Sequence, residues 1–402
     1  MTYYTLFRFV RYTIERMIIA LLGRQPELGF TELTRLYGRE AVTMYGREAA
    51  LVRTGDFDIQ SVGGTVKAGR VLATVPGRGW PAVERAILRE LTALCDDIDQ
   101  KITLGISVYG TFRVQPRELQ KLLLSVKRAQ KALSRSVRII PNQTLALNTA
   151  VSHHNKLGLS PHHIELLVVH NGSETTIATS VGAQNITALA RRDQGRPARD
   201  AFVGMLPPKL ALMMVNMGIG QNTGSHTVLD PFCGTGVVLQ EALLRGYDVV
   251  GTDLSEKMVS YSLRNLDWLI QSHHVEGAVR SVAEGNATTH TWTLPIDAVV
   301  CETYLGQPFS ATPSPSKLRE VRGNCNHIVS EFLRNIHSQL QPGTPLCIAV
   351  PAWRDLKTGR VTRLPLVHEL TTLGFTAETT QPLLYFREDQ VVARDILLIS
   401  NK

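Results

Sequence analysis

The sequence predicts an α/β protein, with an α+β N-terminal half and a C-terminal half built on a parallel, doubly wound sheet. Beyond residue 205, short buried-strand runs alternate with helix-compatible stretches, a pattern typical of such a sheet. These runs are Val228-Leu229, Val249-Val250, Ala298 to Cys301 and Leu346 to Val350. The last two runs, Leu383 to Phe386 and Ile396 to Ile399, predict an antiparallel hairpin at the edge of this sheet.

The composition fits a globular chain of several domains. Of its 402 residues, 44% are hydrophobic and 19% charged, enough apolar material for two or three cores. The 43 Lys and Arg exceed the 35 Asp and Glu, which suits a polyanionic partner but also occurs in proteins without one. Arg8, Arg11, Glu15 and Arg16 interrupt the apolar N-terminus, so no membrane anchor is expected.

The five cysteines are odd in number, widely spaced and free of any CxxC pair. This usage predicts a reducing, cytoplasmic location and supports neither a disulfide framework nor a zinc site. Adjacent histidine pairs, which begin at His153, His162 and His273, do not change this, because neighbouring side chains diverge. No metal is therefore expected.

The N-terminal half divides into two predicted domains, residues 17–95 and 96–185. A strand pattern begins at Met17, which leaves residues 1–16 as an extension of uncertain status. Helices are predicted over Pro26 to Tyr37 and Pro81 to Asp97. A strand from Ile102 to Val108 and a hairpin that turns at Asn171-Gly172 belong to the second domain.

The helix predicted from Pro116 to Ser134 has two contrasting faces. The apolar face carries Leu119, Leu122, Leu123, Val126 and Leu133. The opposite face carries Lys121, Arg128, Lys131 and Arg135, which either bind phosphates or form a solvated surface. A polar linker over residues 186–204 follows, and its Arg192 and Arg196 either contact a nucleic acid or brace the two halves of the chain.

The strongest local motif is the run Asp230-Pro231-Phe232-Cys233-Gly234-Thr235-Gly236, between a predicted strand and a predicted helix. Its glycines let the backbone approach a ligand at the helix start, where free amides favour an anionic group. Asp253 ends the next strand, 23 residues past Asp230, where a carboxylate can accept hydrogen bonds from both hydroxyls of a ribose.

Residue types in this loop exclude two nucleotide-binding alternatives. A phosphate-binding P-loop requires Lys after its last glycine, where this chain has Val237, and a dinucleotide fingerprint requires Gly or Ala at Leu239. The acid-first pattern fits S-adenosylmethionine instead, with Phe232 and Leu254 beside it. Asn286 and Ala287 follow the third predicted strand, where Asn286 either hydrogen-bonds the adenine ring or only forms a turn.

These segments together resemble the THUMP-domain tRNA guanosine N2-methyltransferases. Besides the glycine loop, the resemblance includes Gly204 to Leu210, Arg192 to Asp200, Arg387 to Gln390, Leu22 to Leu28 and Gly63 to Lys67. It implies an N-terminal ferredoxin-like domain, a THUMP domain that binds RNA, a linker, and a Rossmann-like class I methyltransferase domain over residues 205–402. It also implies a tRNA substrate and, as in some relatives, a small activating protein subunit.

In this family an Asp/Asn-Pro-Pro-aromatic motif follows the fourth strand. The two hydrogens of an exocyclic amine must be accepted there so that its lone pair can turn towards the methyl group, while the aromatic ring stacks on a flipped base. Here Glu302, Thr303 and Tyr304 occupy this position and are the catalytic candidates, but both prolines are missing. Glu302 is expected to orient the amine and accept its proton, or else only to cap a turn.

The sequence thus predicts direct methyl transfer from S-adenosylmethionine to a guanine amine in tRNA, without a covalent enzyme intermediate. Two alternatives stay open: a DNA amino-methyltransferase, which would share both motifs, and an RNA-binding protein whose methyltransferase fold has lost catalysis at the altered strand end.

Overall fold

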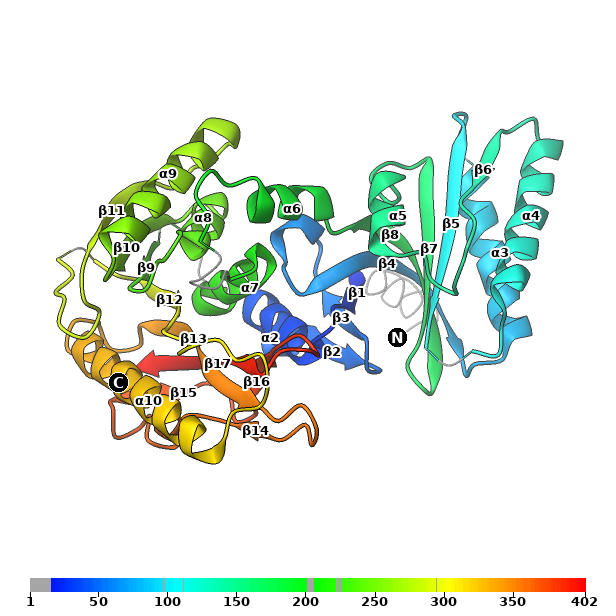
Figure 1. The fold of residues 1–402 in the computed structure, drawn as a ribbon. Helices are drawn as coiled ribbons and strands as arrows, with labels where there is room; N and C mark the ends of the chain where they lie inside the picture. Colours follow the sequence, from blue (N-terminus) through cyan, green and yellow to red (C-terminus); the bar gives the residue numbers. More distant parts are fainter. Residues whose placement is uncertain are drawn as a thin grey trace, which may run out of the picture. The chain divides into compact units, whose positions relative to one another are not determined.

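The structure, a computed structural model, describes residues 16–96, 98–110, 112–200, 206–221, 224, 226–293 and 295–402. The described chain forms two compact units, and the chain passes from one to the other between Ala188 and Leu189, inside the segment predicted as a linker (Figure 1). Nearly all of the predicted extension, residues 1–15, lies outside the described residues. Among the described residues, no helix combines the length and the apolar character needed to cross a membrane.

The N-terminal unit is built on one eight-stranded sheet with the order β2-β3-β1-β4-β8-β7-β5-β6. Its strands are β1 (Met17–Leu22), β2 (Val42–Tyr45), β3 (Ala49–Arg53), β4 (Thr65–Pro76), β5 (Ile102–Tyr109), β6 (Val137–Ile139), β7 (His163–His170) and β8 (Glu174–Ala183). Its helices are α2 (Pro26–Tyr37), α3 (Trp80–Asp96), α4 (Pro116–Ala132) and α5 (Thr149–His154), with 3-10 turns η1 (Arg39–Ala41) and η2 (Ile59–Ser61). The predicted hairpin at Asn171-Gly172 is confirmed as β7 and β8.

The long strand β4 joins the two predicted N-terminal domains, because it pairs antiparallel with β1 on one side and with β8 on the other. Helix α3 also departs from the predicted boundary at residue 95. Its Val83, Ile87 and Leu91 are buried with the apolar side chains of α4 and β5. Residues 80–96 therefore pack with the second predicted domain, and the sheet continues through the boundary.

Helix α4 begins where the sequence predicts, since Pro116 fixes its first turn and the side chains of Gln115 and Glu118 form a reciprocal capping box. Its predicted apolar face is buried at Leu119, Leu122, Leu123 and Val126. The prediction is wrong for Leu133, which is the C-cap and is 59% exposed, because the helix ends one residue before it.

A fully buried ion pair lies inside the N-terminal sheet. The Lys67 Nζ on β4 donates to Glu165 Oε1 on β7 at 2.5 Å, to Ser107 Oγ on β5 at 3.2 Å and to the Leu147 carbonyl at 2.7 Å. Burial lowers the pKa of Lys67, and the adjacent Glu165 opposes that shift. The ammonium thus links three strands and the loop before α5.

The C-terminal unit contains a second sheet with the order β11-β10-β9-β12-β13-β17-β15, to which β14 and β16 add short pairings. Its strands are β9 (Thr227–Asp230), β10 (Asp248–Asp253), β11 (Val279–Glu284), β12 (Ala298–Glu302), β13 (Pro345–Arg354), β14 (Val361–Thr362), β15 (Phe375–Ala377), β16 (Leu383–Tyr385) and β17 (Val392–Asn401). Its helices are α7 (Pro208–Ile219), α8 (Val237–Leu244), α9 (Glu256–Ser272) and α10 (Pro315–His337), with the 3-10 turn η3 (Pro365–His368); α6 (Ile186–Gln194) spans the border between the units.

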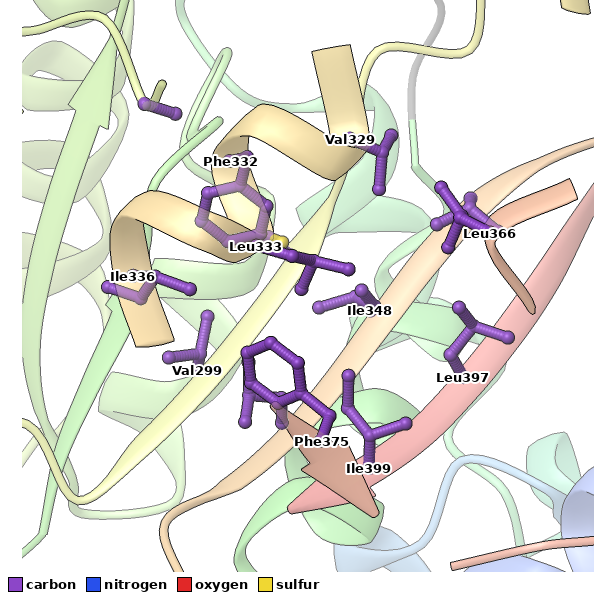
Figure 2. Packing of buried hydrophobic residues seen from close by; sticks show 14 of the residues in the cluster. Val299, Val329, Phe332, Leu333, Ile336, Ile348, Leu366, Phe375, Leu397 and Ile399 are labelled. Carbon is purple, nitrogen blue, oxygen red and sulfur yellow. The ribbon is translucent and has the colours of Figure 1, made fainter. Parts of the chain in front are cut away.

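The predicted parallel, doubly wound sheet is confirmed. Strands β11, β10, β9, β12 and β13 run parallel, whereas β17 is antiparallel to β13 and pairs with β16 as the predicted hairpin. On one face, Phe332, Leu333 and Ile336 of α10 pack against Val299 and Ile348 of the sheet (Figure 2). Helix α7 packs on the other face, against β12 and β13.

We expect Lys67→Met to destabilise the N-terminal unit by roughly 3–5 kcal/mol, because it leaves the Glu165 charge buried without its partner. The double variant Lys67→Met/Glu165→Met should recover a large part of this loss. Urea unfolding followed by circular dichroism measures both changes, and Lys101→Met, at an exposed lysine, is the control. Equal losses in the single and double variants would contradict the importance of charge pairing.

Candidate functional site

The order of the second sheet fixes where a ligand can bind. The chain runs outward from β9 through β10 to β11, then crosses over to β12 on the other side of β9. In open α/β sheets, the crevice at the carboxyl ends of the strands beside such a reversal is the usual ligand site. Asp230, Asp253 and Glu302 are the last residues of β9, β10 and β12, so three acidic side chains share this edge.

The glycine loop after β9 requires the residues that the sequence supplies. Gly234 and Gly236 have φ angles of +50° and +80°, in the left-handed region that side chains disfavour. A Cβ on Gly236 would overlap Ser262 Oγ, so α9 leaves no room for one. Among the described residues, the nearest atom to a Cβ on Gly234 would be the Phe232 carbonyl oxygen, at 4.0 Å. The loop is therefore packed behind Gly236 and open at Gly234.

Asp253 ties this loop to β10. Its Oδ2 accepts a hydrogen bond from the Gly234 amide at 2.9 Å, and its Oδ1 accepts one from the Ser255 amide at 2.9 Å. A carboxylate has about four acceptor positions, so each oxygen can accept a further hydrogen bond. Leu254 beside it is 71% exposed, an unusual position for a large apolar side chain and one that suits contact with a ligand.

Asp230 is only 2% exposed, and its Oδ1 accepts a hydrogen bond from the Phe232 amide at 3.1 Å. Burial raises the pKa of the Asp230 carboxyl well above its usual range; the Phe232 amide opposes this, whereas the negative charges of Asp253 and Glu302 raise it further. The three carboxylates therefore interact electrostatically, and the edge of the sheet favours a cation.

The aromatic and amide candidates around the loop have different surroundings. Phe232 is partly buried against α10, with its ring edge-to-face with Phe332 at 5.1 Å between centroids. Asn286 follows β11 as expected and is exposed, but its Oδ1 accepts from the Thr288 amide at 3.0 Å and from the Thr288 hydroxyl at 2.8 Å, which forms a turn. The Ala287 side chain is buried in the core.

The predicted catalytic segment lies at the carboxyl end of β12. The Glu302 carboxylate accepts a hydrogen bond from Arg394 Nε on β17, and the two side chains form an ion pair. Thr303 is buried, and its hydroxyl and amide both donate to the Ala349 carbonyl, at 3.1 and 2.9 Å. Its hydroxyl thus holds the segment on β13. Tyr304 is 46% exposed, as a residue whose ring stacks on a base must be.

Sequence reasoning missed Arg394, although one signal for it was present. Arg394 and Asp395 are adjacent charges in a strand that is otherwise mostly buried and apolar, and a buried charge requires a partner. Asp395 pairs with Arg363 at 2.5 Å, whereas Arg394 pairs with Glu302. The signal predicts that partners exist but does not identify them.

The RNA-binding prediction for Arg192 and Arg196 requires correction. The Arg192 Nε and Nη2 donate to the two carboxylate oxygens of Glu241 on α8, at 2.6 and 3.1 Å. The Arg196 side chain is fully buried, and its Nη1 donates to Thr235 Oγ1 in the glycine loop at 3.2 Å. Both guanidinium groups hold the linker on the C-terminal unit, with only 12% of the Arg192 side chain and none of the Arg196 side chain exposed.

The basic face of α4 keeps its predicted character at three positions. Lys121, Arg128 and Lys131 are exposed, together with Lys127, which is not among the predicted residues. Arg135 lies 3.5 Å from an Asp96 carboxylate oxygen and also donates to the Asp96 carbonyl, so it ties the end of α3 to the turn after α4.

The comparisons with known proteins agree with this fold. A tRNA (guanine(10)-N2)-dimethyltransferase from Methanothermobacter thermautotrophicus is 34% identical over 168 residues, which are 41% of this chain and 45% of the relative. A glycine N-methyltransferase from Mus musculus is 29% identical over 145 residues, 33% of this chain and 42% of that protein. The chain thus spans less than half the length of these two curated relatives, and no family model matches it.

Among solved structures, TrmN from Thermus thermophilus matches with a TM-score of 0.52 and 16% identity, over 96% of this chain and 99% of that chain. At such a low sequence identity, the structural match shows a shared fold and nothing more. The chain therefore has an α/β methyltransferase-like fold, and the predicted resemblance to tRNA guanosine N2-methyltransferases is confirmed over the 168 residues that match the relative from Methanothermobacter thermautotrophicus.

Proposed function

We propose that this protein transfers a methyl group from S-adenosylmethionine to the exocyclic amine of a guanosine in tRNA. The observation that carries the proposal is the convergence of Asp230, Asp253 and Glu302 around the open glycine loop of a methyltransferase-like sheet. The matched archaeal relative is named for this chemistry and supports the choice of substrate. The segments that the sequence shares with THUMP-domain enzymes support it too.

The residues at the site fit the donor. S-adenosylmethionine, when bound, supplies a methyl group on a positively charged sulfonium. Asp253 has acceptor positions for the ribose hydroxyls, Asp230 contributes negative charge that complements the cation, and the open side of Gly234 admits a ligand against the backbone. The exposed Leu254 offers an apolar surface to a flat ring, while Asn286 would contact that ring through its side-chain amide.

Glu302 and Tyr304 have the chemistry that a guanine amine needs. The lone pair of the amine is delocalised into the ring. Both N–H groups must therefore donate hydrogen bonds to the protein before the nitrogen can act as a nucleophile. A Glu302 oxygen accepts a hydrogen bond from one N–H of the amine and takes up that proton as the nitrogen gains the methyl group. A backbone carbonyl of the same segment accepts a hydrogen bond from the other N–H. Tyr304 stacks on the base and excludes water from it.

We further propose that the N-terminal unit contains the ferredoxin-like and THUMP domains and holds the RNA. The exposed Lys121, Arg128 and Lys131 on α4 supply positive charge for phosphates. Cytoplasmic location and a small activating subunit stay predictions.

Glu302→Ala should lower the rate of methyl transfer to tRNA by at least about a hundredfold, since an acceptor aimed at the reacting group is removed. Donor affinity, measured by calorimetry, should change little. Glu320→Ala, at a glutamate of α10 whose side chain is 68% exposed, is the matched control. Wild-type turnover in the Glu302 variant would show that the residue only caps a turn, and preference for duplex DNA over tRNA would favour the DNA enzyme.

Asp230→Asn should stabilise the donor-free protein while weakening donor binding. The folded pKa of Asp230 is raised, so its ionised form costs stability above that pKa, and the cost is lost as pH falls towards the unfolded value of about 3.9. We expect Tm at pH 8 to rise by roughly 2–4 °C for each kcal/mol that is relieved, and the gain over wild type to shrink in acid. Asp267→Asn on α9, an exposed position, is the control. A lower Tm at pH 8 would refute the electrostatic argument.

The triple variant Lys121→Gln/Arg128→Gln/Lys131→Gln should weaken tRNA binding and reduce its salt dependence. Each lost phosphate contact lowers the slope of log affinity against log salt by roughly 0.7–0.9. Filter binding at several salt concentrations measures this slope. The control Arg39→Gln/Arg47→Gln/Arg53→Gln makes the same charge change near β2 and β3, and equal slopes in the two variants would exclude a specific role for α4.

A further inference from the structure

Glu302 and Arg394 meet on one face of the second sheet, at the edge that carries the proposed site. Glu302 pairs with Ala349 on β13, and Ala349 pairs with Ile396 on β17. Alternate residues of a strand share a face, so Arg394, two residues from Ile396, points to the same side as Glu302. On β13, Arg394 pairs with Pro351, which lies two residues beyond Ala349, the partner of the last residue of β12.

One small side chain, that of Ala349, lies between the two charged residues on this face. Ala349 lies between Glu302 and β17 and projects only a methyl group, so the long arginine side chain can cross β13. The opposite face of β17 carries Asp395, which has its own partner in Arg363. The adjacent charges of β17 thus serve opposite faces of the sheet, and the Arg394 guanidinium is directed to Glu302.

The two oxygens of Glu302 have different surroundings. Oε1 accepts the hydrogen bond from Arg394 Nε, whereas within the described residues no side chain or amide donates to Oε2. The Glu302 side chain retains 15% of its exposure and the Arg394 side chain only 10%, so the contact is sheltered while part of the carboxylate remains accessible. One oxygen is held, and the other is available to a substrate.

We propose that Arg394 is a positioning residue, which fixes Glu302 by one oxygen so that the other faces the substrate amine. Glutamate has three side-chain torsions, and ordering it costs up to ~2 kcal/mol unless another group holds it. Misplacement of a reacting group by about 1 Å can cost about a hundredfold in rate. Asp230 and Glu302 share the site and repel each other, and the positive charge of Arg394 offsets this repulsion. This inference rests on the proposed function.

The test is a double-mutant cycle of Arg394→Gln and Glu302→Ala, with single-turnover methyl transfer to tRNA as the main measurement. Arg394→Gln should slow transfer by about a hundredfold, with donor affinity and the KM for tRNA within a few-fold of wild type. In the Glu302→Ala background it should slow transfer no further, because its effect passes through that carboxylate. Arg394→Lys, which keeps the charge, should restore part of the rate.

Two further measurements separate positioning from stability. Thermal unfolding should show coupling between the two residues, and calorimetry should show intact donor binding in Arg394→Gln. Arg280→Gln is the matched control, because it removes an arginine from the Asp248 carboxylate at the opposite, amino end of the same sheet. Its transfer rate should equal that of wild type.

Each outcome decides the question. A wild-type rate in Arg394→Gln, or rate losses that multiply in the double variant, would overturn the inference and leave the proposed function intact. If Arg394→Gln does not fold, the cycle with Arg394→Lys decides by the same criterion. Absence of methyl transfer to tRNA by the wild-type protein would instead overturn the proposed function, and the inference with it.

Discussion

The burial of the Asp230 carboxyl at one edge of a parallel sheet, beside two further acidic side chains, is the constraint on which the site of the C-terminal unit depends. Asp230, Asp253 and Glu302 are brought together because the chain reverses its winding at β9, and each is held differently. Asp230 is buried with a raised pKa, Asp253 accepts two backbone amides, and Glu302 is paired with Arg394. Burial of Asp230 costs stability in the donor-free protein, and the shared negative charge of the three side chains favours a positively charged ligand.

Much of the site could be predicted from the sequence because its signals are local. The glycine loop and Asp253 lie on consecutive strand ends, so strand periodicity alone places them at one edge. Asn286 and Glu302 follow from the same logic. The helices of the N-terminal unit were predictable for a similar reason, since proline at the first turn and apolar spacing act within a few residues, as in α2 and α4.

The missed features all depend on contacts between residues distant in the chain. Arg394 pairs with Glu302 across an intervening strand. Arg192 pairs with Glu241 on α8, and Arg196 is buried against the glycine loop. Charge alone could not tell these arginines from ones that bind phosphate. The assignment of α3 failed likewise, because its apolar stripe shows that it packs against a sheet but not against which part of that sheet.

The strand β4 determines how the two halves of the N-terminal sheet are connected. Its residues 65–70 pair with β1 and its residues 67–76 pair with β8, so one strand belongs to both halves of this sheet. A long anionic molecule that touched both halves would therefore contact one continuous sheet. Its shape would then have to match the spacing that β4 sets between the two halves.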